Sequence, residues 1–229
     1  MSFVEEIAER LDAVRARIAA AERRAGRAPG SVRLVLASKT QPPDAIRAAY
    51  RAGARDFGEN YVQEALAKRP ALADLTDIRW HMIGHLQTNK AQAAVENFDL
   101  IHSLDSERLA ARIAQIRPSP KVRILVEINL GGEATKTGIS AERLETFINA
   151  VRELVDVAGL MTIPPEVDEP EDARPYFVRM RELRDKLAAR TGLALSELSM
   201  GMTTDFEVAI EEGATIVRIG RAVFGERLK

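Results

Sequence analysis

The sequence predicts an α/β fold in which eight parallel strands close into a (β/α)8 (TIM) barrel. Short β-branched and Leu-rich runs alternate with helical segments along nearly the whole chain, which is the pattern of parallel βαβ units. The strand-like runs are almost continuously apolar, as expected of a sheet that is covered on both faces. Eight such units within 229 residues fit the length of one barrel.

The predicted elements follow in chain order. An amphipathic helix, acidic at first and basic later, spans the N-terminal residues MSFVEEIAERLDAVRARIAAAERRAG. The eight strands are expected at Val32–Ser38, Arg55–Glu59, Ile78–Ile83, Leu100–Ser103, Val122–Ile128, Val157–Met161, Leu195–Ser199 and Thr215–Ile219. The helices between them are expected at Pro43–Ala52, Tyr61–Lys68, Thr88–Glu96, Ser106–Ile116, Ala141–Leu154, Glu171–Arg190 and Asp205–Glu212. We interpret the proline-rich segment Pro164–Pro175 as a loop at the barrel mouth.

Little chain follows the eighth predicted strand, so an eighth outer helix has almost no residues to form from. The N-terminal helix can take that place, which would explain why it precedes the first strand. No linker-like stretch divides the chain, and residues 1–229 are therefore predicted to form a single domain. A doubly wound sheet is the alternative fold, because alternation alone does not determine the strand order.

Composition argues against several classes of partner. The chain has 33 basic and 34 acidic residues, so no global basic field would attract nucleic acid or an anionic membrane. It has no cysteine, which excludes disulfides and thiolate metal sites. The N-terminus lacks the apolar region of a signal peptide, and no apolar run approaches the roughly 18 residues of a membrane span. We therefore expect a cytoplasmic protein with no metal site.

The loops after the seventh and eighth predicted strands predict a phosphate site. They read SMGMTTD and RIGRAVFG, and each combines glycine with the start of a short predicted helix. Barrels often bind phosphate in these two loops. The N–H groups at a helix N-terminus are unpaired donors, and glycine lets the backbone approach an oxyanion closely. The sequence therefore predicts a phosphorylated ligand.

Lys39 ends the first predicted strand, in LASKTQP. A lysine at such a position is ordinarily a solvated loop charge, but the stem of this one begins inside the barrel wall. Barrel closure would bring the first strand beside the eighth, which carries Arg218. A lysine amine forms a Schiff base only when neutral, and a neighbouring cation favours the neutral form. Lys39 and Arg218 thus predict a phosphorylated aldehyde as the ligand.

Two further polar side chains are weaker candidates. Asn60 follows the second predicted strand, where it can bind a ligand hydroxyl or cap the next helix. His81 lies within an apolar strand, which is more typical of a hydrogen-bonded barrel histidine than of a catalytic one.

Six motifs together closely resemble the YggS/PROSC family of pyridoxal phosphate homeostasis proteins. They are LVLASKTQP, RDFGENYVQE, WHMIGHLQTNK, LVEINLGGEATKTG, GLMTIPP and LSMGMTTDFEVAIEEGATIVRIGRAVFG. The resemblance runs through nearly the whole chain. It implies a barrel like the N-terminal domain of bacterial alanine racemase (fold type III), with pyridoxal 5′-phosphate (PLP) held as a Schiff base on Lys39.

The resemblance also implies roles for the other site residues. Ser199 and the backbone of Gly220 and Arg221 would hold the phosphate, and Arg218 would face the pyridine nitrogen. Asn60 and Met161 would line the ring, and Lys136 would make a secondary cofactor contact. Gly201 is a further cofactor-binding candidate because it follows the seventh predicted strand.

The family is identified with vitamin B6 balance and has no established catalytic turnover, so we expect no catalytic residue. An arginine beside the ring nitrogen does not readily give up a proton, because its pKa is above about 12. The expected role is a carrier or regulator, a monomer or weak dimer that delivers PLP to apo PLP-dependent enzymes. The alternatives are a slow amino-acid racemase or transaminase, and a Schiff-base aldolase that binds a sugar phosphate.

Overall fold

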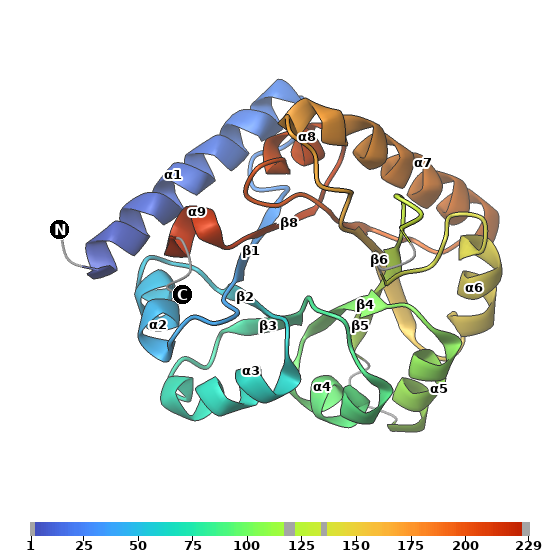
Figure 1. The fold of residues 1–229 in the computed structure, drawn as a ribbon, viewed down its shortest axis with the longest axis horizontal. Helices are drawn as coiled ribbons and strands as arrows, with labels where there is room; N and C mark the ends of the chain where they lie inside the picture. The colour runs from blue at the N-terminus through green and yellow to red at the C-terminus, as the bar shows by residue number, and fades with distance from the viewer. Residues whose placement is uncertain (1–2, 117–121, 134–136, 226–229) are drawn as a thin grey trace.

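A closed ring of eight parallel strands forms the centre of the computed structural model, which describes residues 3–116, 122–133 and 137–225. The strands are β1 (Arg33–Ala37), β2 (Asp56–Glu59), β3 (Arg79–Met82), β4 (Leu100–Leu104), β5 (Arg123–Ile128), β6 (Asp156–Thr162), β7 (Glu197–Ser199) and β8 (Ile216–Ile219). They follow one another around the ring in chain order (Figure 1). The predicted barrel is therefore confirmed, and the doubly wound alternative is excluded.

Barrel closure joins the two ends of the sheet. β1 pairs with β2 on one side and with β8 on the other, where Val35 lies opposite Arg218. Because all strands are parallel, their carboxyl ends meet at one mouth of the barrel. Lys39 follows β1 by two residues and Gly220 directly follows β8, so both lie at this mouth.

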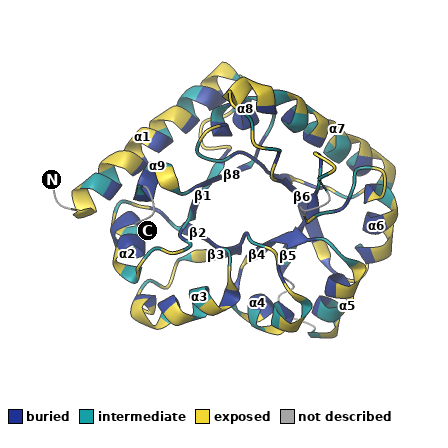
Figure 2. Ribbon diagram, in the orientation of Figure 1, coloured by how far each residue is buried: buried dark blue, intermediate teal, exposed yellow. Residues whose placement is uncertain are grey.

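Helices surround the strands and turn their buried faces inward (Figure 2). The α-helices are α1 (Phe3–Arg24), α2 (Pro43–Arg51), α3 (Val62–Lys68), α4 (Ala91–Asn97), α5 (Glu107–Ile116), α6 (Leu144–Val151), α7 (Arg174–Thr191), α8 (Phe206–Glu211) and α9 (Arg221–Phe224). Short 3-10 turns are η1 (Arg69–Leu72), η2 (Thr88–Lys90) and η3 (Pro170–Ala173). None of the helices within the described residues has both the length and the apolar character needed to cross a membrane.

The N-terminal helix α1 occupies the place of an eighth outer helix. Ile7, Leu11, Val14 and Ile18 are buried along it at the spacing of one helix face. This face packs on α2, α8 and α9 (Figure 1). Since α9, after the last strand, has only four residues, α1 covers the part of the barrel that α9 leaves open, as the sequence predicts.

Two predicted helices and the proline-rich segment differ from the prediction. The segment predicted at Thr88–Glu96 divides into η2 and α4, and the helix predicted at Ala141–Leu154 is reduced to α6. The proline-rich segment is not a loop throughout, because η3 begins at Pro170 and Pro175 lies in the first turn of α7. Proline is favoured there because the first-turn N–H that it lacks has no partner within the helix.

Successive side chains of each strand point to opposite faces of the sheet, which gives the molecule two separate apolar cores. The larger core lies between the strands and the helices. The smaller one fills the barrel and consists of Val35, Ile83, Leu100, Leu125, Ala158, Met161 and Ile216. On β8, for example, Ile216 belongs to the inner core and Val217 and Ile219 to the outer one. Arg218 therefore projects into the barrel, since successive side chains of a strand point to opposite faces.

Candidate functional site

A cavity of about 490 Å³ opens at the carboxyl ends of the strands. It brings together five of the residues predicted from the sequence: Lys39, Asn60, Arg218, Gly220 and Arg221. These residues come from the ends of β1, β2 and β8, which closure of the barrel places next to one another. The cavity thus contains an amine, a guanidinium and an amide within a single mouth.

Three other predicted residues lie off the lining of this cavity. Met161 belongs to the apolar core inside the barrel. Ser199 is fully buried, and its hydroxyl is bonded to His102 and to Arg218. Gly201 has φ +93° and packs against α8, where an added Cβ would lie 2.6 Å from the Cβ of Ala209. Their direct contact with a ligand stays a prediction.

Lys136, predicted as a secondary contact, lies outside the described residues.

Thr203 and Thr204 line the cavity after β7. The strand-end rule selects Thr203 within the SMGMTTD motif but not Thr204, and the resemblance assigns the phosphate contact in this loop to Ser199 instead. Local geometry explains the difference. Ser199 is the last residue of β7 and points into the barrel, whereas the turn at Gly201 carries the chain on to the mouth.

The backbone reverses sharply just after Lys39. Thr40 has φ +64°, in the left-handed region that a β-branched residue rarely adopts. The carboxylate of Glu64 on α3 accepts the Thr40 N–H at 2.5 Å and so supports this conformation. Surrounding structure must hold such a residue in place, and strain of this kind clusters at functional sites. The turn fixes the direction in which the chain leaves Lys39.

A buried ion cluster holds the residues on both sides of Lys39. The ammonium of Lys68 lies 2.9 Å from the carbonyl oxygen of Ser38, 3.0 Å from Glu59 and 2.6 Å from Glu64. Glu59 also accepts the Ser38 hydroxyl at 2.7 Å. Burial raises the pKa of Glu59, against the opposing effects of Ser38 and Lys68. Ser38 and Thr40 are thus anchored to one cluster.

The guanidinium of Arg218 is buried and held by two hydrogen bonds. Nη1 donates to the Ser199 hydroxyl at 2.5 Å and Nη2 donates to the carbonyl oxygen of Thr162 at 2.9 Å. Burial lowers the pKa of Arg218 to about 10, although the negative charges of Asp205 and Glu127 oppose this change. Arg218 is therefore still a cation at neutral pH. It presents a fixed positive charge to the cavity.

The loop after β8 offers backbone donors to an anion. Gly220 precedes α9, where Val223 and Phe224 donate to the Gly220 carbonyl oxygen and the N–H groups of Arg221 and Ala222 have no acceptor within the helix. An added Cβ at Gly220 would lie 3.2 Å from the carbonyl oxygen of Ala37. The small residue therefore lets this loop approach the end of β1, close to Lys39.

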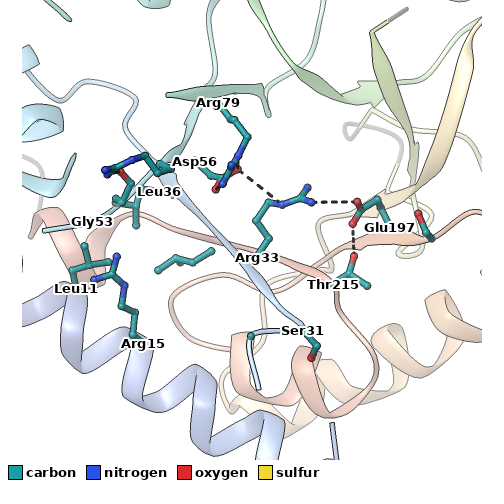
Figure 3. Close-up of a pocket in the computed structure, with 15 residues that line it drawn as sticks. Leu11, Arg15, Ser31, Arg33, Leu36, Gly53, Asp56, Arg79, Glu197 and Thr215 are labelled. Atoms are coloured by element: carbon teal, nitrogen blue, oxygen red, sulfur yellow. Dashed lines mark hydrogen bonds and ion pairs between the residues drawn. The ribbon is translucent and has the colours of Figure 1, made fainter. Parts of the chain in front are cut away.

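A second cavity, of about 580 Å³, lies at the opposite end of the barrel (Figure 3). Arg33 lies between two carboxylates there, 4.0 Å from Asp56 and 3.6 Å from Glu197. Arg79 approaches Asp56 to 2.5 Å. These charges satisfy one another, and active sites of such barrels lie at the carboxyl ends of the strands. We interpret this end of the barrel, called the floor below and formed by Arg33, Asp56, Arg79 and Glu197, as structural.

Across residues 3–116, 122–133 and 137–225, no group of three or more His, Asp or Glu side chains is placed to hold a metal ion.

Comparison with known families and proteins agrees with this geometry. The family model of the alanine racemase N-terminal domain matches residues 10–228. A pyridoxal phosphate homeostasis protein of Aquifex aeolicus is 52% identical over 223 residues, covering 96% of this chain and 97% of that protein. One of Pseudomonas aeruginosa is 45% identical over 225 residues, with 96% of each covered.

Solved structures give the same result. PipY of Synechococcus elongatus with PLP bound is 39% identical and has a TM-score of 0.84, covering 96% of this chain and 100% of PipY. Alanine racemase of Corynebacterium glutamicum, at 18% identity and a TM-score of 0.69 over 98% of this chain and 62% of the racemase, shares the fold. This chain therefore belongs to the family of pyridoxal phosphate homeostasis proteins, which has the fold of the alanine racemase N-terminal domain.

Proposed function

We propose that this protein binds PLP reversibly as a Schiff base on Lys39 and acts in vitamin B6 homeostasis. In this role it is a carrier or regulator without catalytic turnover. The observation that carries the proposal is the single mouth that holds Lys39 beside the buried cation of Arg218. It is supported by relatives named for PLP homeostasis and by the PLP-bound structure of PipY.

The residues of the cavity fit this cofactor. Lys39 would provide the amine. The first turn of α9 and the side chains of Thr203 and Thr204 would provide donors for a phosphate, and Arg218 would provide a donor for the ring nitrogen. The buried Oδ1 of Asn60 has no hydrogen-bond partner among the described residues, so it can accept a ligand hydroxyl. When bound, PLP supplies an aldehyde that condenses with an amine.

The charge on Arg218 supports a role without turnover. A guanidinium that keeps its proton donates a hydrogen bond to the ring nitrogen but does not protonate it, so the ring is a weaker electron sink. Racemisation also needs an acid–base group on each face of the substrate carbon, and Lys39 supplies one. We therefore expect the protein to hold its cofactor rather than to use it.

The first test is a visible spectrum before and after borohydride reduction, followed by peptide mapping. We expect a yellow protein whose absorption band disappears on reduction and leaves a pyridoxyl group on Lys39. Lys39→Ala should abolish the label, whereas Lys186→Ala, at an exposed position of α7, should leave it unchanged. A colourless protein that stays unlabelled after incubation with PLP would favour the sugar-phosphate aldolase.

The second test separates a carrier from an enzyme. The loaded protein is incubated with an apo aminotransferase and a phosphatase that destroys free PLP. Recovery of aminotransferase activity would support apo enzymes as the recipients. Steady conversion of an L- to a D-amino acid, lost in Lys39→Ala, would instead favour the racemase.

A further inference from the structure

A chain of buried hydrogen bonds crosses the barrel interior from β2 to β8. His81 Nε2 lies 3.0 Å from the Asp56 carboxylate, and His81 Nδ1 lies 3.0 Å from His102 Nε2. His102 Nδ1 lies 2.9 Å from the Ser199 hydroxyl, which accepts Arg218 Nη1 at 2.5 Å. All five side chains are buried. The chain links the charged floor to the mouth that holds Lys39.

The two ends of this chain determine the direction of its outer bonds. Burial by itself would raise the pKa of Asp56, but hydrogen bonds from Arg79 and His81 outweigh it and lower the pKa to about 2. Asp56 is therefore a carboxylate that only accepts, and His81 must carry a proton on Nε2. Arg218 only donates, so the oxygen of Ser199 must accept from it.

The inner bonds then have one arrangement in which every donor has an acceptor and both rings are neutral. His102 donates from Nε2 to His81 Nδ1, and the Ser199 hydroxyl donates to His102 Nδ1. The opposite arrangement needs an additional proton on His81. It also turns the Ser199 hydroxyl hydrogen away from His102, although His102 and Arg218 are the hydrogen-bond partners that Ser199 has within the described residues.

The charges around the two rings favour the neutral arrangement. Burial lowers the pKa of His102 well below its usual value, and positive charge on His81, Arg218 and Arg33 acts in the same direction. At the other ring, Asp56 is itself bonded by Arg79 at 2.8 and 2.5 Å, so part of its negative charge is already compensated. His102 is therefore neutral, and the pairing of every donor with an acceptor favours the arrangement in which His81 Nδ1 accepts from it.

We propose that Asp56, His81, His102 and Ser199 form a one-directional chain, with both histidines as neutral Nε2–H tautomers, that positions Arg218 at the cavity. Ser199 then acts through the guanidinium rather than on a phosphate, because His102 takes its only proton. The floor of the barrel thereby helps to orient the cation at its mouth.

Nitrogen-15 NMR of the unliganded protein tests the chain directly, because ring-nitrogen shifts report which nitrogen carries the proton. We expect His81 and His102 to show protonated Nε2 and unprotonated Nδ1 between pH 6 and 8. The half-exposed His85, which lies 3.1 Å from Asp105 and outside the chain, provides a reference signal that is assigned from His85→Gln. A cationic His81, or a proton on His102 Nδ1, would overturn the proposal.

Ser199→Ala tests the link from the chain to Arg218. Loss of the hydroxyl should shift the His102 Nδ1 resonance, since that nitrogen loses its donor; an unchanged resonance would contradict the chain. Cofactor affinity should fall roughly three- to tenfold, whereas the exposed Ser196→Ala control should match the unaltered protein. Unaltered affinity beside a shifted resonance would refute the positioning role.

The affinity measurement rests on the proposed function, whereas the NMR measurement does not. If the unaltered protein also fails to bind PLP, the proposed function is at fault and not the chain.

Discussion

At the scale of single residues, the geometry around Lys39 and Arg218 explains how a small set of side chains makes a site. Thr40 departs from ordinary backbone conformation directly after Lys39, and Glu64 supports it. Arg218 is held on two sides by Ser199 and by the Thr162 carbonyl. In both cases hydrogen bonds fix the donor or the backbone before a ligand arrives, which reduces the entropy lost on binding.

Arg218→Glu should change the absorption and reactivity of bound PLP, because a carboxylic acid can give the ring nitrogen the proton that a guanidinium keeps. Arg218→Lys retains the charge but loses the planar pair of donors, so it should mainly weaken binding. The measurement is a visible spectrum of each variant at saturating PLP, with circular dichroism to verify folding. An unchanged spectrum in a folded Arg218→Glu protein would contradict the contact with the ring nitrogen.

At the scale of secondary-structure elements, α3 and α1 support the site from outside the barrel. The helix α3 supplies Glu64 and Lys68, which anchor the end of β1. The helix α1 replaces the missing outer helix and packs on α2, α8 and α9. These contacts join elements that are separated along the chain, so the secondary-structure propensity of a short segment does not predict them.

Lys68→Met should destabilise the fold by roughly 3–5 kcal/mol at pH 8, because Glu59 stays buried without its cation. The pKa of Glu59 is raised in the folded state. A carboxyl group whose pKa is raised by folding favours the fold at low pH, and this contribution is lost as the pH rises through its pKa in the folded state. Loss of Lys68 raises that pKa further, so the destabilisation should be smaller at pH 5.

Urea unfolding of Lys68→Met at the two pH values checks this prediction. The double variant Lys68→Met with Glu59→Gln, which removes the buried charge, should lose the pH dependence. A defect of equal size at pH 5 and pH 8 would show that the buried carboxylate is not its cause.

Leu11→Ala should cost about 2–5 kcal/mol of folding free energy, because Leu11 is fully buried on the inner face of α1. Glu9→Ala, on the exposed face of the same helix, should cost little. Chemical denaturation measures the free energy of unfolding of both variants, which change residues on opposite faces of the same helix. Equal stabilities would mean that α1 is not part of the cooperative core.

At the scale of the whole molecule, the barrel interior joins a charged floor to the mouth. Floor residues Arg33, Arg79 and Glu197 come from strands β1, β3 and β7. Their ion pairs link strands around the ring, because Arg79 pairs with Asp56 on the adjacent β2 and Arg33 reaches Glu197 past β8 (Figure 3). Asp56 belongs both to this floor and to the chain that ends at Arg218. The acid stability of the entire barrel should therefore depend on Asp56.

Asp56→Asn should lower stability at pH 7 by roughly 2 kcal/mol. The folded pKa of Asp56 is lowered from 3.8 to about 2. A carboxyl group whose pKa is lowered by folding stabilises the fold at pH values above its pKa in the unfolded chain. This contribution is lost as the pH falls toward about 2. The difference from the unaltered protein should thus be constant above about pH 5 and shrink below pH 4.

Urea unfolding between pH 2 and pH 7 measures the effect. Asp74 also has a pKa lowered to about 2, chiefly by Arg47, but it lies on the surface. Asp74→Asn is therefore a matched control that should cost much less. Equal costs at the two positions would argue against a special role for the barrel floor.

The sequence by itself predicts the barrel and five of the residues around its cavity. The alternation of apolar runs and helical segments predicts eight βα units, because side-chain periodicity is a local property of the chain. The rule that function lies at the carboxyl ends of barrel strands selects Lys39, Asn60, Arg218, Gly220 and Arg221, and the structure places all five around one cavity. The family resemblance adds the cofactor.

Only the tertiary structure decides which of these residues meet. Ser199 and His102 are 97 positions apart, and closure of the barrel alone brings them into contact. Whether a strand-end side chain points to the mouth or into the interior depends on where the strand stops, which local propensity does not define. That is why Thr203 and Thr204 line the cavity while Ser199 lies inside, at the end of a chain of hydrogen bonds that begins on the floor.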